Sequence, residues 1–327
     1  MVVDFSYCEE NPLRAYAGRN GNKRCLIYHG DMYMFKFHTH RKNREDLSYT
    51  NDFISEHLGC QIFNSVGFEA QETILGMYNG RPGVACKDFA VNGFTLLEAN
   101  KLKNAYGFER VGKGENYDEM MLLINEQKII PKEQLKKKFW DMFVVDALVG
   151  NFDRHSGNWG FLVNEKTKET RFAPIYDCGS CLFPAANALI INKVLNDENE
   201  LKMRVYGFPN SALRIGEEGK ESKINYFDYI SSLQNEDCNA ALKRIVPLID
   251  MKKINSFIDS VDMISDKQKE FYSLMVGSRK ALILDYSLSL LNDRERNENY
   301  KMVKEGLDEY FAKRQARSLE NPHGPKL

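Results

Sequence analysis

The chain has 327 residues, 43% of them hydrophobic, which is enough to build a core for two domains or for one two-lobed domain. Its 45 basic residues nearly balance its 46 acidic residues, so nothing global indicates nucleic acid or an anionic membrane as a partner. No apolar run approaches the roughly 18 residues of a membrane span, and the N-terminal residues lack a signal-peptide pattern. The seven scattered cysteines favour free thiols in a reducing compartment, and we expect a cytoplasmic location in the producing cell.

The N-terminal region contains a glycine loop followed by two short strands. Gly18 and Gly21 lie in a small polar loop whose backbone N–H groups could approach phosphates, although an ordinary surface turn is an equal alternative. The following residues predict strands over 25–28 and 32–37. Lys36 is the lone cation of the second strand and should project from the face opposite to its aromatic neighbours. A kinase keeps its phosphate-binding lysine on such a strand, whereas an isolated strand lysine is usually just solvated.

Residues 50–65 begin with capping residues and predict a helix with one buried face. Glu56 falls on the otherwise apolar stripe of this helix, so its carboxylate should point inward. A buried carboxylate needs a cation, and Lys36 is the candidate for the lysine-to-helix ion pair of a kinase small lobe. The alternative is an amphipathic helix with Glu56 at the edge of the buried stripe.

The next strand candidates span residues 67–77 and 83–89. The second begins apolar and ends in Lys87 and Asp88, as expected for a strand that leads into the connection between two lobes. In that geometry the backbone of Cys86, Lys87 and Asp88 would face the edge of an adenine ring. Residues 93–131 look mostly helical and polar, interrupted by a loop at 112–116.

The densest set of reactive groups lies between residues 146 and 183. The apolar spacing of residues 132–149 predicts a helix that ends at Gly150. Asp153, His155 and Asn158 follow in one short loop. Two apolar runs at 159–164 and 171–176 then predict a β-hairpin that delivers a second carboxylate, Asp177. We expect this order of elements to bring the carboxylates of Asp153 and Asp177 and the amide of Asn158 to the opening of one site.

These residue types suit phosphoryl transfer. The reaction needs a carboxylate that accepts the hydroxyl proton, a role for Asp153, and oxygen ligands for Mg²⁺, a role for Asn158 and Asp177. The step from Asp153 to Asn158 equals the Asp-to-Asn step of the protein-kinase catalytic loop, and Gly179 would let the chain turn sharply after Asp177. The competing interpretation is a polar loop that uses Asp and Asn as turn formers.

The remaining segments are less informative. Residues 184–223 would begin with the segment that covers a kinase active site and then become ill-defined, whereas the chain from Tyr226 onward is helical in pattern. Residues 292–317 predict a terminal helix, and the last residues a disordered tail. Cys178 and Cys181 form a CxxC motif, but no second motif of matching spacing supports a zinc site.

Taken together, the motifs resemble those of the HipA-like serine/threonine kinases. The resemblance covers roughly residues 12–290. It is carried by the segments GNFDRHSGNWG at 150–160 and APIYDCGS at 173–180, with weaker small-lobe signals at 34–37 and 86–89. The compact organisation most resembles the cell-translocating branch of the family. This resemblance implies unconventional export to a host cell as an alternative location, for which the sequence shows no targeting signal. The implied fold is α+β, a two-lobed protein-kinase-like fold with a small β-rich N-lobe at 1–90, a larger mostly helical C-lobe at 91–315 and a tail at 316–327.

The resemblance also implies roles for individual residues. Lys36 would contact the phosphates of ATP, Asp153 would be the catalytic base, and Asn158 with Asp177 would bind Mg²⁺. The phosphate-covering loop would lie near Gly18 and Gly21, and His155 is a further candidate for nucleotide contact. An antitoxin partner is not carried over, because only a short lead precedes the glycine loop.

The leading hypothesis is therefore an ATP- and Mg²⁺-dependent kinase that phosphorylates Ser or Thr of a protein substrate, including itself, with no nucleic acid as partner. A lipid or small-molecule kinase is a rival, since phosphoinositide kinases also use a D-R-H-x-x-N loop. Residues 178–192 contain no Lys or Arg to hold an inositol phosphate, which favours a protein substrate. A non-catalytic pseudokinase or toxin scaffold that binds nucleotide without turnover is the second class of hypothesis.

Overall fold

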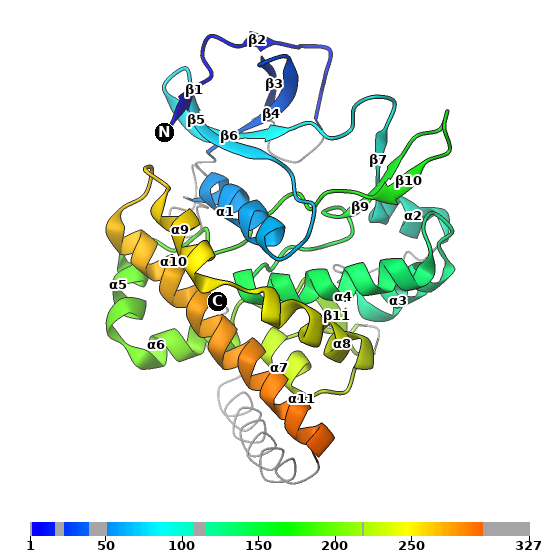
Figure 1. Ribbon diagram of the computed structural model, residues 1–327, viewed down its shortest axis with the longest axis vertical. Helices are drawn as coiled ribbons and strands as arrows, with labels where there is room; N and C mark the ends of the chain where they lie inside the picture. Colours follow the sequence, from blue (N-terminus) through cyan, green and yellow to red (C-terminus); the bar gives the residue numbers. More distant parts are fainter. Residues whose placement is uncertain (1, 17–22, 39–50, 108–114, 218, 297–327) are drawn as a thin grey trace.

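The computed structural model describes residues 2–16, 23–38, 51–107, 115–217 and 219–296. In Figure 1 a small β-rich part lies above a larger, mostly helical part, and α1 (Asp52–Ser65) lies between the sheet above and α4 (Lys132–Val149) below. The predicted two-lobed α+β architecture is therefore present. None of the helices in the described ranges is long and apolar enough to cross a membrane.

The small lobe is built on a six-stranded sheet with the order β1-β5-β6-β4-β3-β2. Its strands are β1 (Val3–Asp4), β2 (Glu9–Glu10), β3 (Lys23–Tyr28), β4 (Asp31–Phe37), β5 (Thr73–Tyr78) and β6 (Arg81–Lys87). All neighbours pair antiparallel except β1 and β5, which are parallel. The predicted strand pairs at 25–37 and 67–89 are confirmed with shifted ends.

The two faces of β4 have different surroundings because side chains alternate along a strand. Tyr33, Phe35 and Phe37 are buried in a small core that the sheet shares with Phe5 and Leu26. The residues between them point to the other face, toward the main core that includes α1. This alternation places the lysine at position 36 on the face that α1 covers.

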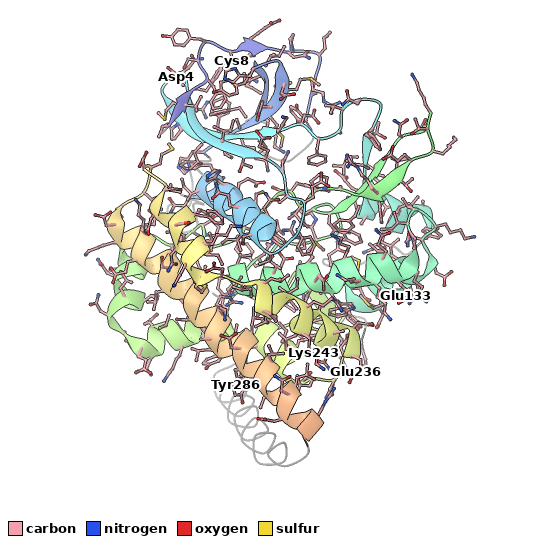
Figure 2. All side chains as sticks on the ribbon, viewed as in Figure 1. Asp4, Cys8, Glu133, Glu236, Lys243 and Tyr286 are labelled. Atoms are coloured by element: carbon pink, nitrogen blue, oxygen red, sulfur yellow. The ribbon has the colours of Figure 1, made fainter. Side chains whose placement is uncertain are left out.

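The larger lobe surrounds α4, whose second half is buried from Phe139 to Val149. Side chains crowd the space between α4, α1 and the lower helices in Figure 2. The other helices are α2 (Ala99–Ala105), α3 (Tyr117–Glu126), α5 (Ala188–Asn196), α6 (Glu198–Lys202), α7 (Tyr226–Ser231), α8 (Glu236–Ile245), α9 (Met251–Asp259), α10 (Asp266–Arg279) and α11 (Tyr286–Arg296), with short turns at η2 (Met203–Gly207), η3 (Val246–Leu248) and η4 (Lys280–Asp285). This apolar centre fixes the helix that leads into the candidate catalytic loop.

Two small sheets complete the described part of this lobe. One has the order β10-β9-β7 and the other β12-β11-β8. Their strands are β7 (Thr95–Glu98), β8 (Glu115–Asn116), β9 (Gly160–Val163), β10 (Thr170–Phe172), β11 (Leu213–Ile215) and β12 (Ser222–Lys223). The hairpin predicted after the reactive loop is confirmed as β9 and β10, which pair antiparallel.

The structure corrects the sequence interpretation in two segments. Residues 95–98 form a strand that pairs with β9, where we predicted mainly helix. Residues 184–217 and 219–223 contain α5, α6, η2, β11 and β12, where we predicted an ill-defined region after the segment that covers the active site. Most of the predicted terminal helix and the whole tail fall within 297–327, outside the described residues. The lobe boundary near residue 90 stays a prediction.

Candidate active site

Lys36 lies at the centre of the site. Its Nζ atom is 3.0 Å from Glu56 Oε2 and 3.0 Å from Asp177 Oδ1, so a cation on β4 joins a carboxylate on α1 to another that follows β10. Although burial disfavours its charge, Asp177 and Glu56 raise the pKa of Lys36 well above its ordinary value. Lys36 in turn lowers the pKa of Asp177 to about 2. Both groups are therefore ionised at neutral pH.

Glu56 points inward, as its position on the apolar stripe predicts. Only 1% of the residue is exposed, which excludes the alternative that it sits at the edge of the buried stripe. Its second oxygen, Oε1, has no hydrogen-bond partner among the described residues. Burial raises the pKa of Glu56 and the ion pair with Lys36 opposes this shift. The carboxylate thus depends on Lys36 to remain charged in the interior.

The candidate catalytic loop begins where α4 ends, because Gly150 adopts φ +65°, a left-handed conformation that glycine accepts readily. The backbone N–H of Asp153 donates to Asn151 Oδ1 at 3.0 Å, which fixes the start of the loop. The Asn158 side-chain NH₂ donates to the Asp153 carbonyl at 2.8 Å. This bond closes the loop and orients the Asn158 amide, whose Oδ1 has no partner within the described chain.

Arg154 is a positioning residue whose role the sequence did not reveal. It is buried and forms an ion pair with Asp146 of α4, with Nε 3.1 Å from Oδ2. One of its nitrogens, Nη1, donates both to the Asn158 carbonyl at 2.8 Å and to the Tyr176 carbonyl at 2.7 Å. A single guanidinium group therefore holds the catalytic loop beside the residue that precedes Asp177. The only signal in the sequence was a basic residue between an acid and an amide.

The carboxylate of Asp153 is 51% exposed and is available to a substrate. The Oδ2 atom lies 4.0 Å from Nε2 of His155. Partial burial raises the pKa of Asp153, with His155 opposing the shift and Asp177 adding to it. His155 itself accepts a hydrogen bond from the Gly157 N–H at Nδ1, 3.0 Å away, so its ring is fixed within the loop near Asp153.

Two oxygens of the site fit a magnesium ion. Oδ1 of Asp177 binds Lys36, which leaves Oδ2, and Asn158 contributes its amide oxygen. Carboxylate and amide oxygens are ligands that Mg²⁺ accepts in proteins. Among the described residues, no group of three or more His, Cys, Asp or Glu side chains is arranged to hold a metal.

The chain bends sharply at Asp177 and in the residues that follow it. Asp177 itself adopts φ +55°, a left-handed conformation that aspartate tolerates better than most residues. Gly179 has no positive φ, and a Cβ added there would lie 3.4 Å from Glu56 Oε2. Gly179 nevertheless lies in a turn directly after Asp177, because the Cys181 N–H donates to the Cys178 carbonyl at 3.0 Å across Gly179 and Ser180. The predicted turn at Gly179 is therefore present, without a left-handed φ at that residue.

Most of the backbone predicted to face adenine is paired within the protein, except the Asp88 carbonyl, for which the described residues provide no hydrogen bond. Cys86 lies within β6 between β4 and β5. The N–H groups of Lys87 and Asp88 each donate to a backbone carbonyl at 2.8 Å, and the Lys87 carbonyl accepts a glutamine side chain at 2.8 Å. Phe89 is the first residue beyond β6 whose N–H has no partner in the described chain. Gly18 and Gly21 lie outside the described residues.

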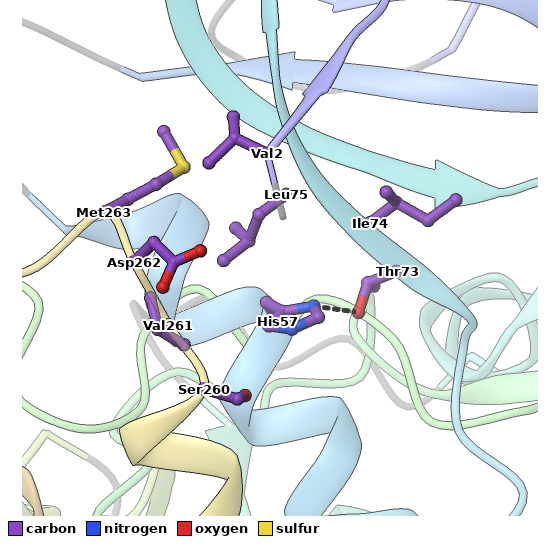
Figure 3. A pocket seen from close by; sticks show the side chains of 9 residues that line it. All are labelled: Val2, His57, Thr73, Ile74, Leu75, Ser260, Val261, Asp262 and Met263. Atoms are coloured by element: carbon purple, nitrogen blue, oxygen red, sulfur yellow. Dashed lines mark hydrogen bonds between the residues drawn. The ribbon is translucent and has the colours of Figure 1, made fainter.

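Two further features surround α1. Cys178 and Cys181 of the CxxC motif are buried free thiols, and a Cβ added to Gly59 would lie 2.7 Å from the Cβ of Cys178. A cavity of about 250 Å³ opens beside His57, the residue after Glu56, and the candidate site residues do not line it (Figure 3). The His57 Nδ1 atom is 2.9 Å from Thr73 Oγ1. α1 is therefore packed on several sides while it holds Glu56.

Comparison with known proteins places this geometry in a family. The family model of the HipA-like C-terminal domain matches residues 23–263. The curated serine/threonine-protein kinase CtkA of Helicobacter pylori is 45% identical over 285 residues, 87% of each chain. The crystal structure of the H. pylori proinflammatory kinase CtkA matches with a TM-score of 0.84 and 43% identity, covering 90% of this chain and 98% of that one.

A more distant structure shows the fold alone. HipA of Shewanella oneidensis, solved with HipB and operator DNA, matches with a TM-score of 0.53 at 13% identity, covering 86% of this chain and 70% of that one. These findings confirm the resemblance and the kinase-like fold predicted from the sequence. The chain belongs to the HipA-like C-terminal domain family.

Proposed function

We propose that this chain is a serine/threonine protein kinase that transfers the γ-phosphoryl group of ATP to a protein hydroxyl with the help of Mg²⁺, and that it also phosphorylates itself. The observation that carries the proposal is the Lys36 bridge, in which one Nζ lies 3.0 Å from both Glu56 and Asp177. Its relative CtkA, with 45% identity, is named a serine/threonine-protein kinase, which supports the same activity here.

Lys36 would bind the α- and β-phosphates of the nucleotide. Lys36 is ionised and lies on the sheet of the small lobe, and its Nζ donates to Oε2 of the buried Glu56 at 3.0 Å. Glu56 is thus a positioning residue, since a lysine held by one carboxylate cannot swing away when the phosphates arrive. We place the adenine edge at the end of β6, at the Asp88 carbonyl and Phe89, because the N–H groups of Lys87 and Asp88 and the Lys87 carbonyl already have partners. Residues 1–90 would then cover the nucleotide and 91–315 would carry catalysis.

Asn158 and Asp177 would hold the magnesium ion. The metal would neutralise charge on the phosphate oxygens and align them for in-line transfer. Arg154 fixes the backbone of Asn158 and of the residue before Asp177 with one nitrogen atom, at 2.8 Å and 2.7 Å. The two ligands come from segments that are distant in sequence, and this arginine holds the segments side by side.

Asp153 would accept the proton of the acceptor hydroxyl at its carboxylate. Its raised pKa makes it a stronger base than an ordinary aspartate, and its exposed side chain leaves room for a substrate. The bond from Asn158 to the Asp153 carbonyl keeps the base in register with the metal ligands. The similarity to the HipA structure with HipB and DNA concerns the fold only, so we propose neither an antitoxin nor a nucleic acid as partner.

The test is a transfer assay with labelled ATP and Mg²⁺ on the full chain and on a panel of protein substrates. Wild type should label a substrate or itself, and Asp153→Asn should lower the rate at least about a hundredfold, as loss of a catalytic base does. Asp259→Asn, at an exposed position of α9, is the matched control and should retain activity. Label on inositol lipid alone would favour the rival lipid kinase. A nucleotide that stabilises the fold without any transfer would support the non-catalytic alternative.

A further inference from the structure

The small sheet β12-β11-β8 places two cations opposite each other. Arg214 of β11 and Lys223 of β12 are direct cross-strand partners in an antiparallel pair. Like charges in that position repel each other and destabilise a sheet unless something compensates them. β11 is labelled in Figure 1 below α4, in the lobe that carries the candidate catalytic loop.

Two hydrogen bonds tie this sheet to the catalytic loop. Ser156 donates from Oγ to Glu115 Oε1 at 2.8 Å, and Glu115 lies on β8, the strand next to β11. The hydroxyl of Tyr226, three residues after Lys223, donates to the Asn151 carbonyl at 2.6 Å. These contacts bracket Asp153 from both sides along the chain. The strand β8 and the residue that begins α7, Tyr226, thus both contact the loop that carries Asp153.

The cations have no carboxylate partner within the described chain. Arg214 donates from Nη1 to the Glu221 carbonyl at 3.2 Å, and neither cation forms an ion pair with a described residue. Of the described acids in the connecting turn, Glu221 accepts the Gly219 N–H at Oε2, 3.1 Å away, and Glu217 lies 3.9 Å from Lys220. Burial and the charge of Arg214 lower the pKa of Lys223, and the negative charge of Asp153 opposes this shift. Within the described residues, Arg214 and Lys223 thus have no ion-paired carboxylate, and Lys223 lies near enough to Asp153 to interact with its charge.

We propose that Arg214 and Lys223 form a subsite for an anionic side chain of the acceptor protein, so that the enzyme prefers Ser or Thr flanked by acidic or phosphorylated residues. This inference rests on the proposed kinase function. The acceptor hydroxyl must reach Asp153, and residues next to it in an extended peptide lie only about 3.3 to 3.6 Å further along per step. They pass over the surface beside Asp153, where the sheet places the cations. The nucleotide phosphates have their own cation, Lys36, on the opposite lobe.

The experiment compares peptides with one serine flanked by glutamate, alanine or lysine. Wild type should phosphorylate the glutamate peptide with a kcat/KM about tenfold above that of the alanine peptide, the size expected for one or two partly screened charge contacts. In Lys223→Ala and Arg214→Ala this ratio should approach one, and in Lys223→Glu it should invert in favour of the lysine peptide. Lys220→Ala, in the same turn with an 81% exposed side chain, is the control and should keep the wild-type ratio.

The outcomes separate the inference from the proposed function. Equal rates for all three peptides in wild type, or a variant that only raises the KM for ATP, would overturn the subsite while leaving the kinase assignment intact. If wild type phosphorylates none of the peptides, none of the protein substrates and not itself, the proposed function fails, and binding of a fluorescent glutamate peptide still tests the subsite. Weaker binding by Lys223→Glu than by Lys220→Ala supports the subsite, and equal binding refutes it.

Discussion

Replacement of Lys36 by methionine tests how strongly the interior depends on the central ion pair. The change keeps the length of the side chain and removes its charge. It leaves Glu56, which is 1% exposed, without the cation 3.0 Å away. Removing one partner of a buried pair costs about 3 to 5 kcal/mol. We expect a loss near the lower end, about 3 kcal/mol in the free energy of unfolding at about pH 8, because Glu56 escapes part of the penalty by protonation.

The pH dependence gives the sign of the effect. In Lys36→Met the folded state should hold a proton on Glu56 at pH values far above 4.5, the ordinary pKa of this carboxyl group. Between that value and the raised pKa the folded state binds more protons than the unfolded state, so stability falls as the pH rises. The loss should therefore shrink to roughly 1 to 2 kcal/mol at about pH 5.5, where burial of the neutral Glu56 carboxyl and the lost ion pair of Asp177 are the remaining costs.

A double-mutant cycle in denaturant completes the test. Lys36→Met combined with Glu56→Gln should recover about 2 kcal/mol at about pH 8 and lose the pH dependence that Glu56 causes, since neither position then carries a charge. Lys220→Met is the control, because its partner Glu217 and Lys220 itself are 88% and 81% exposed and should contribute almost nothing. The reasoning is refuted if Lys36→Met costs no more than Lys220→Met, or if the double variant is as unstable as the single one.

Three further predictions concern the frame of the site. Arg154→Lys should lower kcat on the order of a hundredfold with little change in the KM for peptide, because lysine cannot bind Asp146 and both backbone carbonyls at once. If a high peptide concentration restores the activity of this variant, the loss lies in KM and the prediction is contradicted. Gly59→Ala should lose about 1 to 3 kcal/mol of stability, since its Cβ would lie 2.7 Å from the Cβ of Cys178. Gly277→Ala is the control and should lose none, because its Cβ would lie 3.8 Å from the nearest atom. Equal melting temperatures of the two variants would refute the close approach at Gly59. Burial lowers the pKa of His57 from 6.5 to about 4, so the folded state binds fewer protons than the unfolded state between these pH values. The free energy of unfolding should therefore fall by up to about 3 kcal/mol as the pH drops from about 6.5 to about 4. His57→Gln should flatten this pH dependence, and a pH dependence equal to that of wild type would refute the prediction.

The parts of the site that follow local periodicity could be predicted from sequence. Alternation along β4 separates Lys36 from its aromatic neighbours, and the helical spacing of α1 directs Glu56 inward. The hairpin after the catalytic loop follows from two apolar runs around a polar turn, and it positions Asp177. In each case the pattern of a single element determines where the side chain points.

The parts that depend on tertiary pairing could not. The two carbonyls that Arg154 binds belong to segments that meet only in the folded chain, at 2.8 Å and 2.7 Å from one nitrogen. The backbone of Cys86 is occupied because β6 lies between two strands, which the sequence of β6 does not indicate. The strand at 95–98 likewise exists through its pairing with β9, and tertiary contact overrides local propensity there.

A crystal structure of the chain with a non-hydrolysable ATP analogue and Mg²⁺ tests the central claim most directly. The account predicts a metal ion about 2.1 Å from Oδ1 of Asn158 and from a carboxylate oxygen of Asp177, with the Nζ of Lys36 on the phosphates. A nucleotide whose phosphates lie away from Lys36, or a metal held by other residues, would contradict it.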